Sequence, residues 1–194
     1  MYRYQVLIEY VGTSFVGWQI QKKGKSIQKI VQSILSKLLK EKIILYGSGR
    51  TDAGVHASEQ SAHFDIKKKI QNIDKTIKSL NFFLNSKMIS IIKIKKKNFN
   101  FHARYSAKER IYVYLIQNRL SPSTINKDRE WHIRKKLDIN LIKKGCKKLV
   151  GTNDFSTFRA SNCSAKSPIR TINAILVSKS KNCIKLKFKS KSFL

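Results

Sequence analysis

Apolar side chains occupy every second position at the start of the chain: Tyr2, Tyr4, Val6, Ile8 and Tyr10. A period of two is typical of a β-strand that buries one face against a core and leaves the other face polar. We therefore predict a strand over residues 2–10.

The next apolar pattern steps alternately by three residues and by one: Ile27, Ile30, Val31, Ile34, Leu35, Leu38 and Leu39. Such steps place the apolar side chains on one stripe of an α-helix. Ser26 comes just before the pattern, and its hydroxyl suits a helix N-cap. We predict an amphipathic helix here, with the stripe facing the core.

Four further elements are predicted in the first half of the chain. Short apolar runs indicate a strand over residues 43–46 and a partner strand over residues 62–66. Asp74 is the candidate cap of a second helix, and a strand over residues 89–94 follows it. Four side chains of that helix are expected to face the core: Ile77, Leu80, Asn81 and Leu84.

The resulting order, βαββαβ, is that of the ferredoxin-like or split βαβ arrangement. Its sheet is antiparallel and both helices cover one face. The other face stays open, and open faces of this kind bind RNA in many small modules.

A lysine run and a turn over residues 96–107 mark a domain boundary near residue 100, giving halves 1–100 and 101–194. In the second half, residues 108–118 alternate like a strand, and strands are predicted near residues 172–177 and 183–188. Between residues 118 and 172 we expect a helix that ends at Gly151. Four of its side chains are expected to face inward: Ile139, Ile142, Cys146 and Leu149.

The predicted fold class is therefore α+β, with two pseudo-repeated ferredoxin-like halves that contain antiparallel sheets. The second half, βαββ, lacks the final helix and strand of such a repeat. An uncovered sheet face would leave large side chains in water at roughly 1.5 to 3 kcal/mol each. We therefore expect either that a partner covers this face or that the chain is a truncated product.

Charge points to a polyanionic partner. Lys and Arg number 41 against 11 Asp and Glu, a formal net charge of +30, and such a surface binds nucleic acid through phosphate neutralisation. Codon bias is an alternative source of many lysines, because Lys, Ile and Asn are all abundant. Arginines are more informative, because the planar guanidinium matches the geometry of a phosphate or carboxylate in a way that the lysine ammonium cannot replace. Five merit separate attention: Arg50, Arg104, Arg110, Arg159 and Arg170.

Other classes of protein are disfavoured. The three cysteines, Cys146, Cys163 and Cys183, are widely spaced and show no metal-ligand spacing with the four histidines. We therefore expect neither a disulfide framework nor a metal site. No run of about 18 apolar residues suggests a membrane span. These features predict a reduced, cytoplasmic protein without a membrane segment.

One string of residues stands out as candidate chemistry. In Gly49–Ala57, the carboxylate of Asp52 lies between Arg50 and a tight Ala-Gly turn. By itself, an aspartate before Ala-Gly is most simply a turn residue that bonds its own backbone. A carboxylate can also serve as a nucleophile, because it stays ionised at neutral pH.

Taken with its neighbours, this string resembles the TruA-type tRNA pseudouridine synthases. The resemblance extends over essentially the whole chain, and the order of the motifs is preserved. The matching segments are Glu9–Thr13 with Phe15, Gly17–Gln19, Gly49–His56, Phe101–Ala107, Tyr112 with Tyr114 and Asn118, Gly151 with Asp154–Phe155, Phe158–Arg159, and Ser167–Pro168 with Arg170.

The resemblance implies isomerisation of uridine to pseudouridine in the anticodon stem and loop of tRNA, by a homodimer without cofactor or essential metal. It places the nucleophile on Asp52, and it suggests that Arg50 holds the flipped nucleotide. Tyr112 matches the tyrosine that stacks on the target uracil. The candidates for contact with the RNA are His102, Arg104, Arg110 and Arg159.

Structural roles compete with these assignments. Tyr112 suits a packed position on a sheet, His102 and Arg104 suit a capped turn between domains, and Trp18 is expected to pack beneath the catalytic loop.

The chain departs from the family pattern at two places. Asn153 stands where the family usually has a histidine that can titrate. The family also continues beyond the Phe-Leu at the end of this chain into a His-Met-Val-Arg segment, whose arginine pairs with the catalytic aspartate.

Two interpretations follow. The chain is an active minimal synthase in which Arg50 or a lysine replaces that arginine, or it is a catalytically impaired truncated homologue that binds tRNA without modifying it. A third, an unrelated basic RNA-binding protein, leaves the Asp52 string unexplained.

Overall fold

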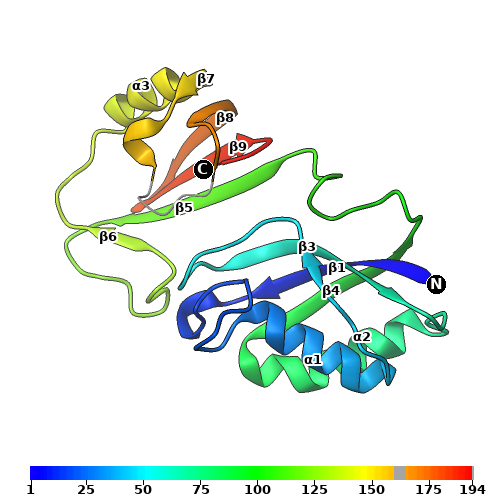
Figure 1. The fold of residues 1–194 in the computed structure, drawn as a ribbon. Helices are drawn as coiled ribbons and strands as arrows, with labels where there is room; N and C mark the ends of the chain where they lie inside the picture. The colour runs from blue at the N-terminus through cyan, green and yellow to red at the C-terminus, as the bar shows by residue number, and fades with distance from the viewer. Residues whose placement is uncertain (160–164, 194) are drawn as a thin grey trace. The chain divides into compact units, whose positions relative to one another are not determined.

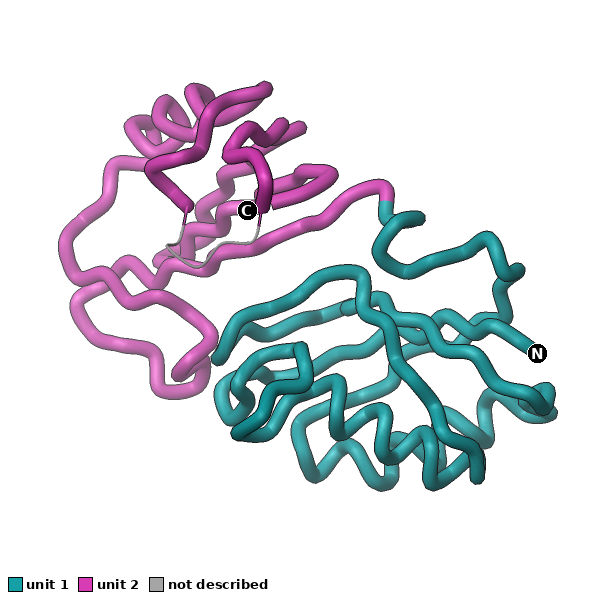
Figure 2. Tube along the Cα trace, in the orientation of Figure 1, with its two compact units in different colours: residues 1–107 teal, residues 108–194 magenta. Residues whose placement is uncertain are grey.

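The computed structural model describes residues 1–159 and 165–193. They form two compact units, residues 1–107 and 108–194, which Figure 2 shows in different colours. Each unit contains its own sheet and at least one helix. The α+β class with two halves is confirmed.

The first unit contains a four-stranded antiparallel sheet with the order β2-β3-β1-β4. Two helices pack against each other and lie on one face of this sheet (Figure 1). This confirms the split βαβ arrangement expected from the sequence. The elements are β1 (Tyr2–Tyr10), α1 (Ile27–Leu39), β2 (Tyr46–Gly47), β3 (Ala57–Ile66), α2 (Ile73–Leu84) and β4 (Ile89–Lys97), with short 3-10 helices η1 (Gly12–Ser14) and η2 (Asn85–Lys87).

The predicted alternation and helical stripe meet in one core. Tyr4, Val6 and Ile8 of β1 are almost completely buried, as are Val31 and Leu35 of α1. The Ser26 side chain caps α1 by accepting a hydrogen bond from the Lys29 amide, as predicted. Burying side chains of this size contributes roughly 1.5 to 3 kcal/mol each, so this core stabilises the sheet that carries the polar face.

Residues 43–46 do not form the predicted strand, because their backbone bonds to side chains of α1. The Ile43 amide donates to Ser36 Oγ at 3.0 Å, and the Leu45 amide donates to Gln32 Oε1 at 3.0 Å. Strand β2, Tyr46–Gly47, begins at the last residue of this segment and pairs with β3. Ile43 and Leu45 are nevertheless buried in the core, whereas Ile44 and Tyr46 are exposed.

The cap of α2 lies two residues before the predicted position. Asn72, and not Asp74, caps the helix, and its side chain accepts a hydrogen bond from the Lys75 amide at 2.8 Å. Asn and Asp are both good N-caps, so the pattern alone did not separate them. Of the side chains predicted to face the core, Leu80 and Leu84 are buried.

The second unit contains a five-stranded sheet with the order β6-β5-β9-β8-β7. Its pairings are antiparallel except for β5 with β6, which are parallel. The short strand β6 was not predicted, since three residues carry too little periodicity. The elements are β5 (Arg110–Asn118), β6 (Trp131–Ile133), α3 (Ile139–Leu149), β7 (Gly151–Asp154), η3 (Ser156–Phe158), β8 (Ile169–Ser180) and β9 (Cys183–Ser190).

Helix α3 packs against β8, but it buries its apolar side less completely than expected. Ile139, Ile142, Cys146 and Leu149 are only partly buried, and no residue of α3 is fully buried. The helix ends at Leu149, and Gly151 follows with a φ of 103°. Glycine adopts this left-handed conformation without the strain that a side chain would bring.

The boundary between the units falls at residue 107, whereas we expected it near residue 100. Residues 101–107 stay with the first unit because they hydrogen-bond to its sheet. Arg3 Nη1 donates to the Phe101 carbonyl at 2.8 Å, and the Ala103 amide donates to His63 Nδ1 at 3.2 Å.

Among the residues described, none of the helices combines the length and the apolar character needed to span a bilayer.

Candidate active site

Asp52 lies in the loop that joins β2 to β3. Strand β3 holds the start of this loop: the Ser48 amide donates to the Ser61 carbonyl at 2.8 Å, and Gln60 Nε2 donates to the Gly49 carbonyl at 2.6 Å. The chain then turns at Ala53 and Gly54 and enters β3 at Ala57. The loop is thus anchored at its base by regular sheet pairing and by a strand side chain.

The segment after β1 holds the middle of the loop. The Tyr10 and Thr51 hydroxyls share a hydrogen bond of 2.8 Å, and the Trp18 amide donates to the Thr51 carbonyl at 3.0 Å. Further on, the Gly12 amide donates to His56 Nδ1 at 2.9 Å. Two motifs that are about 40 residues apart in the sequence therefore form one structure, with Asp52 between the points of attachment.

Two glycines allow this close approach. A β-carbon on Gly12 would lie 2.0 Å from the Val55 carbonyl oxygen, and one on Gly17 would lie 2.6 Å from the Thr51 carbonyl oxygen. Gly17 also has a φ of 106°. Trp18 is buried beneath the loop, as predicted. The sequence between β1 and α1 thus contains glycine where the Asp52 loop contacts it.

Asp52 keeps its carboxylate available. Its backbone carbonyl accepts a hydrogen bond from the Val55 amide at 3.2 Å, which closes the turn. The side chain is exposed, and across residues 1–159 and 165–193 its carboxylate has no hydrogen-bond or ion-pair partner. The turn therefore exists, but the Asp52 side chain does not make it.

Arg50 is exposed on the same loop, two residues before Asp52. In the part of the chain that the structure describes, it forms no ion pair with Asp52. Its guanidinium is thus available to a phosphate or a carboxylate, the groups that its planar fork fits best.

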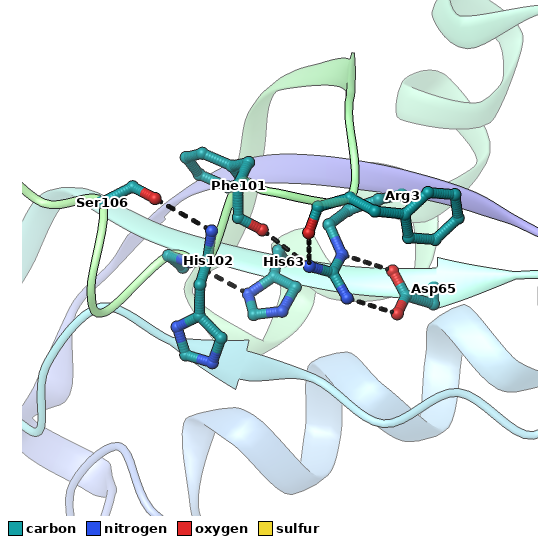
Figure 3. Close-up of polar contacts among 8 residues, drawn as sticks. Arg3, His63, Asp65, Phe101, His102 and Ser106 are labelled. Atoms are coloured by element: carbon teal, nitrogen blue, oxygen red, sulfur yellow. Dashed lines mark hydrogen bonds and ion pairs between the residues drawn. The ribbon is translucent and has the colours of Figure 1, made fainter.

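A second structured segment, residues 98–106, carries His102 and Arg104. Arg3 holds it to the sheet (Figure 3): the guanidinium forms a bidentate pair with Asp65 at 2.7 and 2.8 Å, and its Nη1 donates to the Phe99 and Phe101 carbonyls at 2.7 and 2.8 Å. The hydrogen bonds from Arg3 lower the pKa of Asp65. Bidentate charge-assisted bonds of this kind fix geometry as well as adding energy.

His63 anchors the same segment from below. Its side chain is 1% exposed, and Nδ1 accepts the hydrogen bond from the Ala103 amide. Burial, together with the neighbouring His102, lowers the pKa of His63 from 6.5 to about 4. The imidazole is therefore neutral at pH 7, with Nδ1 unprotonated as this bond requires.

This pKa shift predicts a pH-dependent loss of stability. Between pH 6.5 and about 4, the unfolded chain protonates His63 while the folded chain does not. Stability therefore falls as the pH falls through this window, by up to about 3 kcal/mol. In His63→Gln, the amide oxygen can accept from Ala103 and does not titrate, so the variant lacks this part of the loss. Urea unfolding of both proteins at pH 7 and pH 4.5 tests this, and identical pH dependence would contradict it.

His102 and Arg104 lie in a capped turn. The His102 amide donates to Ser106 Oγ at 3.0 Å, the Ser106 amide donates to the His102 carbonyl at 2.8 Å, and His102 Nδ1 accepts from the Arg104 amide at 3.2 Å. The Arg104 side chain is exposed. The turn role expected as an alternative is thus present, and it leaves Arg104 directed to the surface.

The remaining predicted site residues belong to the second unit. Tyr112 is half-buried on β5, and its ring meets that of Phe193 edge-on at 4.7 Å. Arg110 donates to the Lys191 carbonyl, and exposed Arg159 donates to the Ala165 carbonyl. In place of the family's histidine, Asn153 donates to the Leu149 carbonyl at 3.3 Å and so ties β7 to the end of α3.

The described residues do not include a set of side chains that could bind a metal ion. Across residues 1–159 and 165–193, no group of three or more His, Cys, Asp or Glu side chains is placed to hold a metal ion. The predicted site residues thus comprise one exposed carboxylate, one tyrosine, one histidine and several arginines.

Sequence comparison identifies proteins with the same motifs. Residues 6–106 and 146–194 match the family model described as tRNA pseudouridine synthase. A protein of Pelagibacter ubique (strain HTCC1062) named tRNA pseudouridine synthase A is 66% identical over 194 residues, which cover 100% of this chain and 79% of that protein. A protein of the same name from Anaplasma phagocytophilum (strain HZ) is 40% identical over 195 residues, covering 99% of this chain and 78% of the relative.

The matched residues contain the Asp52 loop, the segment that clamps it and the turn with His102 and Arg104, whereas Arg110 and Tyr112 lie between the two matched ranges. Because the family model covers most of the chain and the two relatives align with almost all of it, this chain belongs to the tRNA pseudouridine synthases, a family of isomerases.

Proposed function

We propose that this protein converts uridine to pseudouridine in the anticodon stem and loop of tRNA, with Asp52 as the nucleophile. The observation that carries the proposal is the exposed Asp52 carboxylate, whose loop is fixed on both sides by Thr51 and His56. Fixing a reactive group before the substrate arrives removes part of the entropic cost of reaction.

The reaction breaks the bond from ribose C1′ to uracil N1, rotates the base and joins C5 to C1′. The Asp52 carboxylate acts on the ribose, either by attack at C1′ or by removing a proton from the sugar. The hydrogen lost from C5 is balanced by a proton gained at N1. The change is an isomerisation, so it needs no oxidant, reductant or added group, and we propose that no cofactor or metal takes part.

Other residues have roles in binding. Arg50 supports the nucleotide after it leaves the stack, by filling the vacated space or gripping a phosphate. Tyr112 stacks on the target uracil and assists loss of the C5 proton. The remaining four candidates contact the RNA: His102, Arg104, Arg110 and Arg159.

We also propose that the protein acts as a homodimer in the cytoplasm. Both statements rest on the resemblance to the family and not on a contact between two copies of the chain. Sedimentation of the full chain alone and with tRNA measures the number of copies.

Mapping pseudouridine at single-nucleotide resolution tests the proposed substrate. A tRNA transcript is incubated with the full chain, treated with a carbodiimide that modifies pseudouridine selectively, and copied by reverse transcriptase. We expect stops only at uridines of the anticodon stem and loop. Stops confined to other parts of the tRNA would contradict the proposed substrate region, and binding without any stop would favour a protein that binds tRNA without modifying it.

A further inference from the structure

A connected group of rings lies at His63 on the first unit, on the face of the sheet opposite the helices. Tyr46 is the register partner of His63 and stacks on it with 5.1 Å between ring centroids. His102 meets His63 at 4.6 Å, and Tyr105 meets His102 at 4.5 Å. We call Tyr46, His102 and Tyr105 the aromatic platform.

Two of the three platform rings are exposed to solvent. Tyr105 is 78% exposed and Tyr46 is 46% exposed. The segment that carries Tyr105 is tied to the sheet, because His63 accepts a hydrogen bond from the Ala103 amide and Arg3 donates to the Phe99 and Phe101 carbonyls (Figure 3). The Tyr46 ring is backed by the buried His63 ring on which it stacks. A rigid, exposed ring loses little conformational entropy when a flat ligand stacks on it.

Positive charge borders the platform. The Arg104 guanidinium lies 5.8 Å from the centre of the Tyr105 ring, and Lys97 Nζ lies 5.0 Å from the centre of the Phe101 ring. Lys97 continues a row with Lys95 and Lys93 along β4, and the neighbouring ammonium of Lys93 lowers the pKa of Lys95. Aromatic rings beside a row of cations are the arrangement that single-stranded nucleic acid requires.

Tyr46 of the platform and the His63 ring on which it stacks belong to the hairpin that also carries the Asp52 loop, formed by β2, the loop and β3. His63 lies six positions along β3 from Ala57, where the loop ends, a distance of roughly 20 Å at about 3.3 Å per residue. A nucleotide at the platform is therefore not the nucleotide that reacts, but one several positions away on the same RNA.

We propose that Tyr46, His102 and Tyr105 bind an unpaired nucleobase of the RNA substrate by stacking, while Arg104 contacts the adjacent phosphate. The site positions the RNA along the sheet and takes no part in the chemistry. The inference rests on the proposed function for the identity of the RNA, and it adds a second contact remote from Asp52.

A coupling experiment tests this assignment. A series of anticodon stem-loop RNAs, each with one abasic nucleotide, is titrated against the full chain and against Tyr105→Leu and Tyr46→Leu. Loss of a stacked base weakens binding about tenfold. We expect one or two abasic positions to weaken binding by the unsubstituted chain, and the leucine variants to be weaker overall but insensitive to those positions.

Controls separate stacking from charge and from misfolding. Phe82→Leu removes an equally exposed ring (80%) from α2, which covers the other face of the sheet, and should leave the abasic profile unchanged. Arg104→Gln should reduce the slope of log K against log salt by about 0.7 to 0.9, whereas Tyr105→Leu should not. If the leucine variants and the unsubstituted chain show the same abasic profile, the platform does not stack on a base.

Turnover distinguishes this inference from the proposed function. The leucine variants should raise KM about tenfold and keep kcat within about twofold, as expected when binding is lost equally from ground state and transition state. Absence of turnover in the unsubstituted chain would overturn the proposed function, while the binding profiles would still decide the role of the platform. A large fall in kcat with unchanged KM would overturn the platform's role in binding.

Discussion

Replacing Gly12 by alanine is expected to lower kcat for uridine isomerisation by about 100-fold. The new β-carbon would lie 2.0 Å from the Val55 carbonyl oxygen and 2.5 Å from the Val55 carbonyl carbon. Both atoms belong to the backbone of the Asp52 loop, so no side chain can rotate away. The loop must move by about 1 Å or more, and displacement of a reactive group on this scale has a cost of that order.

The same substitution should destabilise the protein by about 1 to 3 kcal/mol, the usual range for overpacking. Gly145→Ala is the matched control, because nothing lies within 4 Å of its β-carbon on α3 and alanine is a better helix former than glycine. Initial rates at saturating tRNA and urea unfolding measure both effects. Full turnover by Gly12→Ala would show that this contact does not position the loop.

The second large effect is expected for Asp52→Asn, which should lower the rate of isomerisation by roughly 10⁴-fold or more, as for other nucleophiles that act together with their neighbours. Asparagine has the same shape as aspartate but lacks the charge needed for attack or proton removal. Because the Asp52 carboxylate is exposed and unbonded within residues 1–159 and 165–193, the substitution removes no native contact. Folding should be unchanged.

Binding of tRNA by Asp52→Asn should be equal to that of the unsubstituted chain or slightly tighter, because one negative charge is removed from a strongly basic surface. Glu59→Gln makes the same charge change at an exposed position of β3 and should retain full turnover. Fluorescence anisotropy with labelled tRNA gives the dissociation constants, and nucleoside composition gives the product. An equal loss of turnover in both variants would show that charge, and not the Asp52 carboxylate itself, controls the rate.

Periodicity predicted the core of the first unit well. The alternation from Tyr2 to Tyr10 and the stripe from Ile27 to Leu39 are both the buried faces of their elements. They succeed because one periodic pattern determines which side of an element leaves water. The strand predicted over residues 43–46 was wrong, because an apolar run does not indicate which groups the backbone hydrogen-bonds.

The candidate site was predicted only in part. The string around Asp52 was visible in the sequence, and so was the packing of Trp18 beneath it. The clamp from Tyr10 and Gly12 was not, because a contact between residues about 40 positions apart leaves no periodic signal. His63 was missed for a related reason: it occupies the polar face of a strand, where its burial comes from residues 98–106 packing over it.

Asparagine at the helix cap and the short parallel strand illustrate the same limit. Asn72 and Asp74 are both good capping residues by type; in the structure Asn72 caps the helix and Asp74 lies in its first turn. Trp131–Ile133 pairs with β5, yet three residues are too few to show a period. Local patterns thus predicted the elements, while long-range hydrogen bonds arranged the site.

Single-turnover release of tritium from tRNA that contains uridine labelled at C5 tests the central claim, that a clamped and exposed Asp52 drives isomerisation on this chain. The protein is in excess over tRNA, and Asp52→Asn serves as the blank. We expect release from the unsubstituted chain to approach the number of modified uridines and release by the variant to stay at background. Bound tRNA that retains its tritium with the unsubstituted chain, or equal release by both proteins, would contradict the account.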